Sequence, residues 1–353
     1  MNRSPGQRFR FEQYAGFLKE NGYDITYSNI ISEKDDALFY SRGKLFIKLV
    51  ILLKSIFVRI RDVFRASGYD IIIIYREALM LGTTVFEWMF ARSRASIIFD
   101  FDDAIWLHDV SEGNESLRWM KKPAKIASII KFSDTVFAGN DYLASYAAGI
   151  NTNTIVIPTV INTDYHKKIS YSGNKDAVCI GWTGTSTTIK HLDQALPVLR
   201  ELKNIYSDRI YFKIIADIPY SIEDIDIISV KWNIDTEIED LSEIDIGIMP
   251  LPDDEWAKGK CGFKGLQYMA LEIPTIMSPV GVNKMIINDG VNGFLADTKE
   301  EWIEKAGKLI DSEELRKEMG KKGRETVLKN YSVESQKHNY LKALNDSIVK
   351  KKQ

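Results

Sequence analysis

Two kinds of hydrophobic pattern alternate along most of this chain. Short continuous apolar runs are typical of strands buried on both faces of a parallel sheet, and longer stretches with an apolar residue at every third or fourth position are typical of amphipathic helices. The predicted strands are 23–27, 69–75, 96–99, 133–140, 155–162, 177–180, 211–215, 225–230, 244–249 and 274–277. This order predicts an α/β protein of two Rossmann-like domains with parallel sheets that face an interdomain cleft.

The predicted elements divide at a polar, glycine-containing stretch, 163–175, which is the expected linker. The expected parts are a first domain over 1–163, a second domain over 164–330 and a final helix over 331–353. At the start, residues 4–10 are expected to form a loop that leads into a helix over 11–21. Only three residues precede this loop, so either a segment in front of it is missing, which we favour, or the first sheet lacks its first strand.

Composition narrows the class of protein further. A chain of 353 residues is long enough for two full-sized cores, and its net charge of −2 does not suggest a nucleic-acid partner. Its two cysteines have neither metal-binding nor disulfide spacing, which fits a reducing cytoplasm. The first residues are polar and basic with no apolar core, so we expect no signal peptide and a cytoplasmic location.

Residues 42–65 predict a long amphipathic helix that is rich in lysine and arginine. Lys48 and Lys54 interrupt its apolar residues too often for a membrane span. Two interpretations remain open. The helix either lies on an anionic membrane surface, peripheral on the inner face of the cytoplasmic membrane, or packs with its apolar face on the sheet.

The stretch 245–281 predicts a strand, a loop with glycines and lysines, a helix from Phe263 and a second strand, which together form one parallel βαβ unit. Lys260, Gly262 and Lys264 lie at the loop and the helix start, where backbone amides and ammonium groups suit a phosphate. The alternative is an ordinary solvated loop with surface lysines.

A second strand, loop and helix of this kind surrounds Gly181 to Thr188, with Lys190 close behind. Thr183, Gly184 and Thr185 could hold an anion, although the Gly-Lys-Ser/Thr ending of a P-loop is missing.

Three carboxylates, Asp100, Asp102 and Asp103, follow the strand 96–99. Holding them together is costly, so a partner or a function is expected. The possibilities are a metal-binding Asp-x-Asp site, a site in which Asp102 and Asp103 orient or deprotonate a hydroxyl group, and a structural helix cap.

Several of these segments resemble the retaining family 4 of GT-B glycosyltransferases. The stretch 245–281 resembles the donor-binding segment of the family, and the resemblance is also close at Pro274–Ile276, Pro279–Gly281 and Asn288–Leu295. The family usually has two glutamates eight residues apart, and here Gly259 and Gln267 occupy those places. An arginine that the family places after Gly181 is also missing, so the hydroxyls and amides of Thr183–Thr185 would have to replace it.

The resemblance implies a set of site residues. Those expected to bind the donor are Gly6, Thr183, Gly184, Thr185, Lys190, Trp232, Lys260, Gly262, Phe263, Lys264 and Gln267, and those expected in catalysis are Asp102, Asp103 and Lys264. Trp232 would contact the nucleotide base, or it is simply a core residue. No metal and no other cofactor is expected, because enzymes of this fold do not require one.

The resemblance therefore implies transfer of a sugar from a nucleotide-sugar to a hydroxyl of a glycan or lipid-linked oligosaccharide, with retention, in cell-surface polysaccharide synthesis. Two alternatives are a nucleotide-sugar epimerase and a non-catalytic GT-B-like partner subunit. The missing strand, the missing arginine and the glutamine at position 267 favour the second of these.

Overall fold

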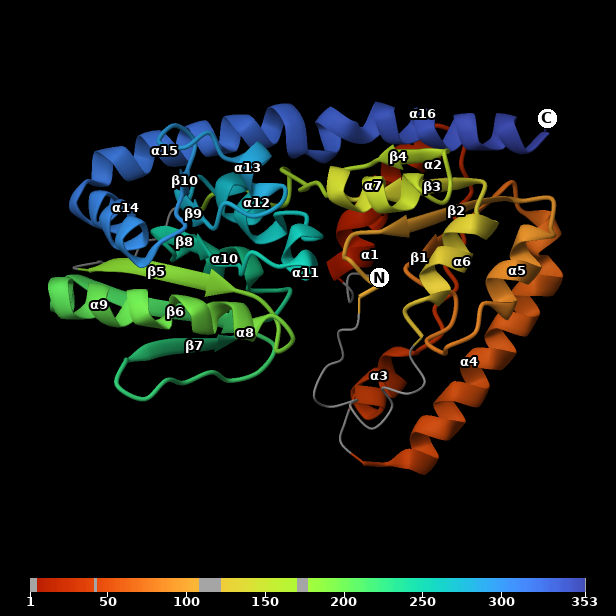
Figure 1. Ribbon diagram of the computed structural model, residues 1–353, viewed down its shortest axis with the longest axis horizontal. Coiled ribbons are helices and arrows are strands. Elements are labelled where there is room, and N and C mark those ends of the chain that lie inside the picture. Colours follow the sequence, from red (N-terminus) through yellow and green to blue (C-terminus); the bar gives the residue numbers. More distant parts are fainter. Residues whose placement is uncertain (1–4, 41–42, 108–121, 170–176, 353) are drawn as a thin grey trace. The chain divides into compact units, whose positions relative to one another are not determined.

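The computed structural model describes residues 5–40, 43–107, 122–169 and 177–352. The chain divides into two compact units (Figure 1), and each is described by itself. Unit 1 comprises residues 1–158 and 337–353, and unit 2 comprises residues 159–336. From the sequence we expect these limits after residues 163 and 330.

Unit 1 is built on a parallel sheet of four strands in the order β1-β2-β3-β4. The strands are β1 (Ile71–Tyr75), β2 (Ser96–Phe101), β3 (Thr135–Ala138) and β4 (Thr154–Val156). Every residue of β2 is buried, as its unbroken apolar pattern predicts. The helices of the unit are α1 (Pro5–Arg10), α2 (Ala15–Glu20), α3 (Glu33–Tyr40), α4 (Leu45–Arg65), α5 (Val85–Ala91), α6 (Lys125–Phe132) and α7 (Asp141–Ala148).

The first thirty residues differ from the prediction. The expected loop over 4–10 is helix α1, and the expected helix over 11–21 is a short 3₁₀ turn, Glu12–Tyr14, followed by α2. The expected strand 23–27 does not form, because its aromatic side chains pack on helices instead of in a sheet. Tyr27 lies over the Phe11 ring at 6.0 Å, and the Tyr23 hydroxyl donates to Asn345 Oδ1 at 2.7 Å.

The last helix, α16 (Val333–Lys352), contributes its second part to unit 1. Tyr340 stacks on Tyr14 with ring centroids 4.3 Å apart, and it meets Phe137 of β3 edge-on at 5.8 Å. The Ser96 hydroxyl at the start of β2 donates to the carbonyl of Ser347 at 3.0 Å. The residues from 337 onward thus complete the core of unit 1.

Unit 2 is built on a parallel sheet of six strands in the order β10-β9-β8-β5-β6-β7. The strands are β5 (Val178–Thr183), β6 (Ile210–Ala216), β7 (Ile227–Lys231), β8 (Ile246–Met249), β9 (Thr275–Met277) and β10 (Phe294–Leu295). The helices are α8 (Ile189–Leu192), α9 (Leu196–Tyr206), α10 (Glu237–Ser242), α11 (Glu255–Lys258), α12 (Phe263–Ala270), α13 (Asn283–Ile286), α14 (Lys299–Asp311) and α15 (Glu313–Thr326).

The strand order of unit 2 decides where a ligand would bind. Counted along the chain from β5, it is the doubly wound order 3-2-1-4-5-6, so the direction of winding reverses between β5 and β8. Ligands of such sheets bind outside the carboxyl ends of the strands at this reversal point. The ends in question are Thr183 of β5 and Met249 of β8.

Candidate functional site

The loop after β5 lies at the reversal point of the unit 2 sheet. Gly184 is needed there because a Cβ atom at this position would lie 2.2 Å from the Trp182 ring. The three backbone N–H groups of Thr183, Gly184 and Thr185 all donate to protein acceptors, which are the Tyr268 hydroxyl (2.8 Å), the Ile215 carbonyl (3.0 Å) and Thr188 Oγ1 (3.0 Å). These three amides are therefore engaged within unit 2, and the expectation that the amides and hydroxyls of the loop replace an arginine stays a prediction.

Three lysines from separate segments gather near this loop. Lys264, in the first turn of α12, places its Nζ 5.5 Å from the centroid of the Trp182 ring. Burial, followed by the charges of Lys264, Lys260 and Lys190, lowers the pKa of His191 to about 4. One imidazole thus lies within electrostatic range of all three ammonium groups, which brings together the lysines expected from the sequence.

The loop that carries Lys260 and Gly262 is held by close backbone packing. Gly262 is the N-cap of α12, with a left-handed φ of 69°. Gly281 also has a left-handed φ, 53°, and a Cβ atom there would lie 2.8 Å from the carbonyl oxygen of Lys258. The turn at Gly281 therefore fixes the start of the lysine-bearing loop, and with it the position of Phe263 at the beginning of α12.

Tyr268 joins helix α12 to the loop after β5. Its ring lies over Gly247 of β8, where a Cβ atom would come within 2.4 Å, and its hydroxyl accepts the hydrogen bond from the Thr183 N–H. The sequence gives no sign of this role, because a tyrosine on the buried face of an amphipathic helix is typical of a core residue.

Trp232 and Gln267 are connected by a buried carboxylate. Glu237 Oε1 accepts from the Trp232 indole N–H at 3.2 Å and from the Gln267 side-chain amide at 3.3 Å. Gln267 Nε2 also lies 3.3 Å from Nε2 of the fully buried His166, whose Nδ1 is 3.1 Å from the Asn162 carbonyl. A ring protonated on Nδ1 would donate to Asn162 and accept from Gln267. Neither Glu237 nor His166 was signalled by the sequence.

In unit 1 the three aspartates have separate environments. Asp100 is fully buried, and both of its carboxylate oxygens accept from Arg10, at 2.8 and 3.0 Å. Asp102 and Asp103 share Arg76, whose Nη2 is 2.7 Å from Asp102 Oδ1 and also bonds to Asp103. Within the described ranges, no three His, Cys, Asp or Glu side chains are grouped as metal ligands would be.

Arg76, directly after β1, has an unusual backbone with φ of 61°, and it holds the two carboxylates at the carboxyl edge of the sheet. The Tyr75 hydroxyl donates to Asp102 Oδ1 at 2.8 Å. Gly6 of α1 packs directly against this hydroxyl, since a Cβ atom there would lie 1.6 Å from it. Gly6 therefore lies beside the Asp102 cluster within unit 1, and its expected contact with a donor stays a prediction.

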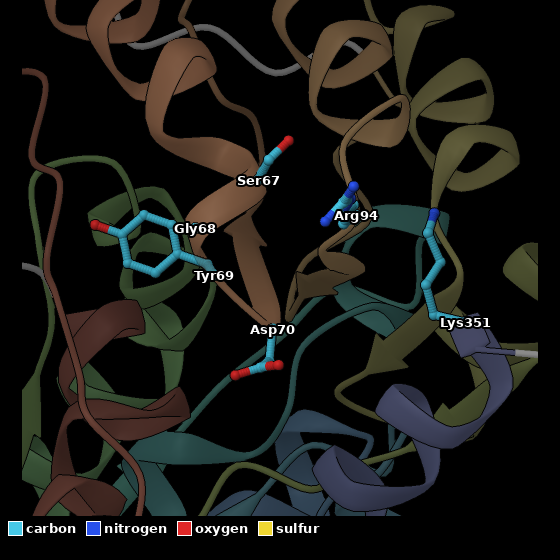
Figure 2. Close-up of a pocket in the computed structure, with 6 residues that line it drawn as sticks. All are labelled: Ser67, Gly68, Tyr69, Asp70, Arg94 and Lys351. Carbon is cyan, nitrogen blue, oxygen red and sulfur yellow. The ribbon is translucent and has the colours of Figure 1, made fainter.

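The pocket in Figure 2 lies at the other end of the strands of the unit 1 sheet, away from the cluster around Asp102. It is an open hollow of about 440 Å³ lined by Ser67, Gly68, Tyr69, Asp70, Arg94 and Lys351. Asp70 and Arg94 precede β1 and β2, so the hollow is at the amino ends of the strands. Because sites of α/β sheets form at the carboxyl ends, we assign it no part in the chemistry.

Helix α4 faces unit 1 with both polar and apolar residues, and its buried residues are Lys48, Ile51 and Ser55. Ser55 donates to the Ile30 carbonyl at 2.9 Å, and Arg59 donates to the Ala78 carbonyl at 2.6 Å and to Asp62 at 2.6 Å. Large apolar side chains lie on the outside: Phe46, Phe57 and Phe64 are 78%, 72% and 84% exposed. Ile51 is buried, so part of the apolar surface of α4 packs on unit 1 and part of it is exposed, and both interpretations of residues 42–65 stay open.

Two α/β units with parallel sheets in one chain are the architecture of the GT-B fold of glycosyltransferases, and solved structures with this fold are similar to the chain. Sucrose-phosphate synthase from Thermosynechococcus elongatus has a TM-score of 0.59 at 13% identity, over 87% of this chain and 79% of its own. Anabaena HepE in complex with UDP and glucose has the same TM-score at 13% identity, over 82% and 81%. The chain has the GT-B fold.

The sequence is also similar to a known family over part of its length. Residues 241–326 match the family described as glycosyl transferases group 1, and this segment contains Lys260, Lys264 and Gln267. TarM of S. aureus has a TM-score of 0.57 at 15% identity over 74% of this chain, which spans about half the length of TarM. A search of curated proteins finds no match. Among the described residues, no helix is both long and apolar enough to cross a membrane.

Proposed function

We propose that this protein transfers a sugar from a nucleotide-sugar to a hydroxyl acceptor. The observation that carries the proposal is the gathering of Lys190, Lys260 and Lys264 around His191 at the reversal point of the unit 2 sheet. This is where a doubly wound sheet binds nucleotides, and three ammonium groups suit a diphosphate. The match of residues 241–326 to group 1 glycosyltransferases supports the same donor class.

The difficult step is departure of the nucleoside diphosphate, whose negative charge grows as the bond to the sugar breaks. Lys264 adds a full positive charge at the first turn of α12, and groups fixed in this way stabilise such charge without rearranging. Because the lysines can supply this stabilisation, we propose a reaction that needs no metal ion. Retention of configuration is proposed from the family resemblance alone.

The acceptor hydroxyl is proposed to be oriented by Asp102 or Asp103 in unit 1. Although burial raises its pKa, the charges of Arg76 and Arg10 and the hydrogen bonds from Arg76 and Tyr75 hold the pKa of Asp102 below its usual range. Asp102 is therefore ionised at neutral pH and accepts hydrogen bonds. It suits a role in positioning a hydroxyl better than a role as a strong base.

We also propose that α4 rests on an anionic membrane surface, which would suit a lipid-linked acceptor. Its outward apolar residues could enter the headgroup region, and Lys54 and Arg61, both exposed, could contact lipid phosphates. The inward polar contacts of Ser55 and Arg59 explain why part of the apolar face is left outside.

The membrane proposal is tested by sedimentation with vesicles of phosphatidylglycerol and phosphatidylcholine. Protein should sediment with the anionic vesicles and less so at high salt, and the double variant Phe46→Ser/Phe57→Ser should stay in the supernatant. Met285→Ser, an exposed apolar residue of unit 2, serves as the control. Failure of the unaltered protein to sediment, or a dimer in solution that the double variant abolishes, would refute the membrane proposal.

The transfer proposal is tested by thermal stability with UDP, GDP and ADP, each with and without EDTA. A ligand at a hundred times its Kd stabilises the folded state by about 2.7 kcal/mol. One diphosphate should stabilise the protein equally in EDTA, and transfer from its nucleotide-sugar to a glycan should follow.

The matched variants are Lys264→Ala and Lys308→Ala, the latter an exposed lysine of α14 paired with Glu304. We expect Lys264→Ala to lower kcat by about 10²–10³-fold, as loss of one charge-stabilising group does elsewhere. Lys308→Ala should leave it unchanged. A non-catalytic partner subunit would bind no nucleotide in this assay, and an epimerase would convert the nucleotide-sugar without an acceptor.

A further inference from the structure

His191 is a buried histidine whose ring is only partly satisfied by hydrogen bonds within the described part of the chain. It lies on the short helix α8, is 4% exposed, and its backbone N–H donates to the Thr188 carbonyl at 3.0 Å. Its ring Nε2 is buried and has no hydrogen-bond partner among the described residues. An orphaned polar atom in the interior usually costs about 1–3 kcal/mol, so a missing partner is expected.

The charged groups around the ring come from four segments. Lys190 belongs to α8, Lys260 to the loop before α12 and Lys264 to α12, and all three disfavour a protonated ring. The opposing carboxylate is Asp254, which is the N-cap of α11 and accepts from the Ala257 N–H at 2.7 Å. Burial, together with three cations against one anion, keeps the imidazole neutral in the free protein.

Entry of a diphosphate would reverse this balance. Its negative charges would offset the three ammonium groups that act on His191, and its oxygens are the acceptors that a ring N–H lacks. We propose that His191 is a further donor-binding residue, which takes up a proton from solvent and holds the diphosphate as a cation when a nucleotide-sugar binds. This inference rests on the proposed function, because it concerns the same donor site.

If His191 takes up a proton on binding, the affinity for the donor depends on pH. In the free protein the pKa of His191 is about 4, and the negative charges of a bound diphosphate should raise it. Donor affinity should therefore rise as the pH falls through the higher value, by up to about tenfold per pH unit, and should level off near the lower one. Protein without donor should show no protonation of this ring between pH 5 and 7.5.

The test is titration calorimetry from pH 5 to 7.5 in buffers that differ in ionisation enthalpy, which measures protons taken up on binding. The probes are UDP-glucose, GDP-mannose and ADP-glucose, because the diester phosphates of nucleotide-sugars do not titrate in this range, whereas the terminal phosphate of a free diphosphate does, near pH 6. The unaltered protein should take up as much as about one proton. His191→Gln should still bind, more weakly, and take up none.

The matched control is His338→Gln, an exposed histidine of α16 in unit 1. It should leave both the affinity and the proton uptake unchanged. If His191→Gln does not fold, ring-nitrogen NMR of the unaltered protein, which has four histidines, should show one becoming protonated on donor addition at pH 6.

Binding without proton uptake, or with equal uptake in His191→Gln, would overturn this role for His191 and leave the proposed function standing. Failure of all three nucleotide-sugars to bind would overturn the proposed function, and the inference with it.

Discussion

At the scale of single residues, Asp102 shows how unit 1 holds one carboxylate ionised. Arg76 and Tyr75 donate to Asp102, and Asp103 shares the same guanidinium. A carboxylate whose pKa is lowered in the folded state contributes stability above its unfolded pKa of about 4, and this stability is lost as the pH falls through the lower folded value. The contribution should therefore be complete at pH 7.

We expect Asp102→Asn to lower the free energy of unfolding by about 1.5–3 kcal/mol at pH 7, because hydrogen bonds to a charged group usually contribute this much to stability. The difference from the unaltered protein should shrink as the pH falls below about 4, because the carboxyl then takes up a proton in the unfolded chain before it does so in the folded protein. Urea unfolding at a series of pH values measures this. Asp208→Asn, at a fully exposed carboxylate, is the control, and a difference that stays constant with pH would contradict the assignment.

Residue roles could be predicted only where a local pattern marked them. Lys190, Lys260 and Lys264 follow predicted strand ends in glycine-containing loops, so the sequence locates them near a ligand edge. Tyr268 could not be found in this way, because its partner Thr183 is 85 positions away. The same holds for Glu237, whose acidic helix is typical of a solvated surface until the structure places it beside Gln267.

At the scale of elements, periodicity predicts a helix but not the direction it faces. The pattern of residues 42–65 gives α4 correctly, since two different faces are enough to indicate a helix. Which face meets the protein depends on acceptors elsewhere in the chain, here the carbonyls of Ile30 and Ala78. The strand predicted over 23–27 was wrong for a similar reason, because apolar and aromatic residues suit a helix surface as well as a sheet.

The turn at Gly281 gives an element-scale prediction about the donor loop. An alanine there would carry a Cβ at a left-handed φ, which costs about 1–2 kcal/mol, and would press on the backbone of Lys258. We expect Gly281→Ala to lower thermal stability and to raise the Kd for a nucleoside diphosphate by displacing the Lys260 loop. Binding is measured by calorimetry.

The control for this prediction is Gly16→Ala in helix α2, where nothing lies within 4 Å of an added Cβ. This change should leave donor binding untouched and could raise stability by as much as about 1 kcal/mol. Equal donor affinity in Gly281→Ala and the unaltered protein would mean that the turn does not position the loop.

At the scale of the whole molecule, each unit has its own sheet and its own core, and the chain passes from unit 2 back to unit 1 within α16. The alternation of strands and helices was sufficient to predict this α/β organisation, because each buried strand and each amphipathic helix is a local pattern. The partners of α16 are not local, and only the structure shows Tyr340 between Tyr14 and Phe137.

Tyr340 therefore allows the two units to be distinguished by experiment. Its ring is almost fully buried in unit 1, so Tyr340→Ala should cost about 3–5 kcal/mol, as truncation of large core aromatic residues does. Scanning calorimetry should show the unit 1 transition at a lower temperature and the unit 2 transition unchanged. A nucleoside diphosphate should raise only the unit 2 transition, because a ligand stabilises the part of the chain that binds it.

Val349→Ala, on an exposed position of the same helix, is the control and should move neither transition by more than a degree or two. If Tyr340→Ala lowers both transitions together, or abolishes nucleotide binding, then α16 couples the folding of the units and the donor site depends on unit 1. If only the first transition moves, the donor site is a property of unit 2 alone, as its strand order and its three lysines imply.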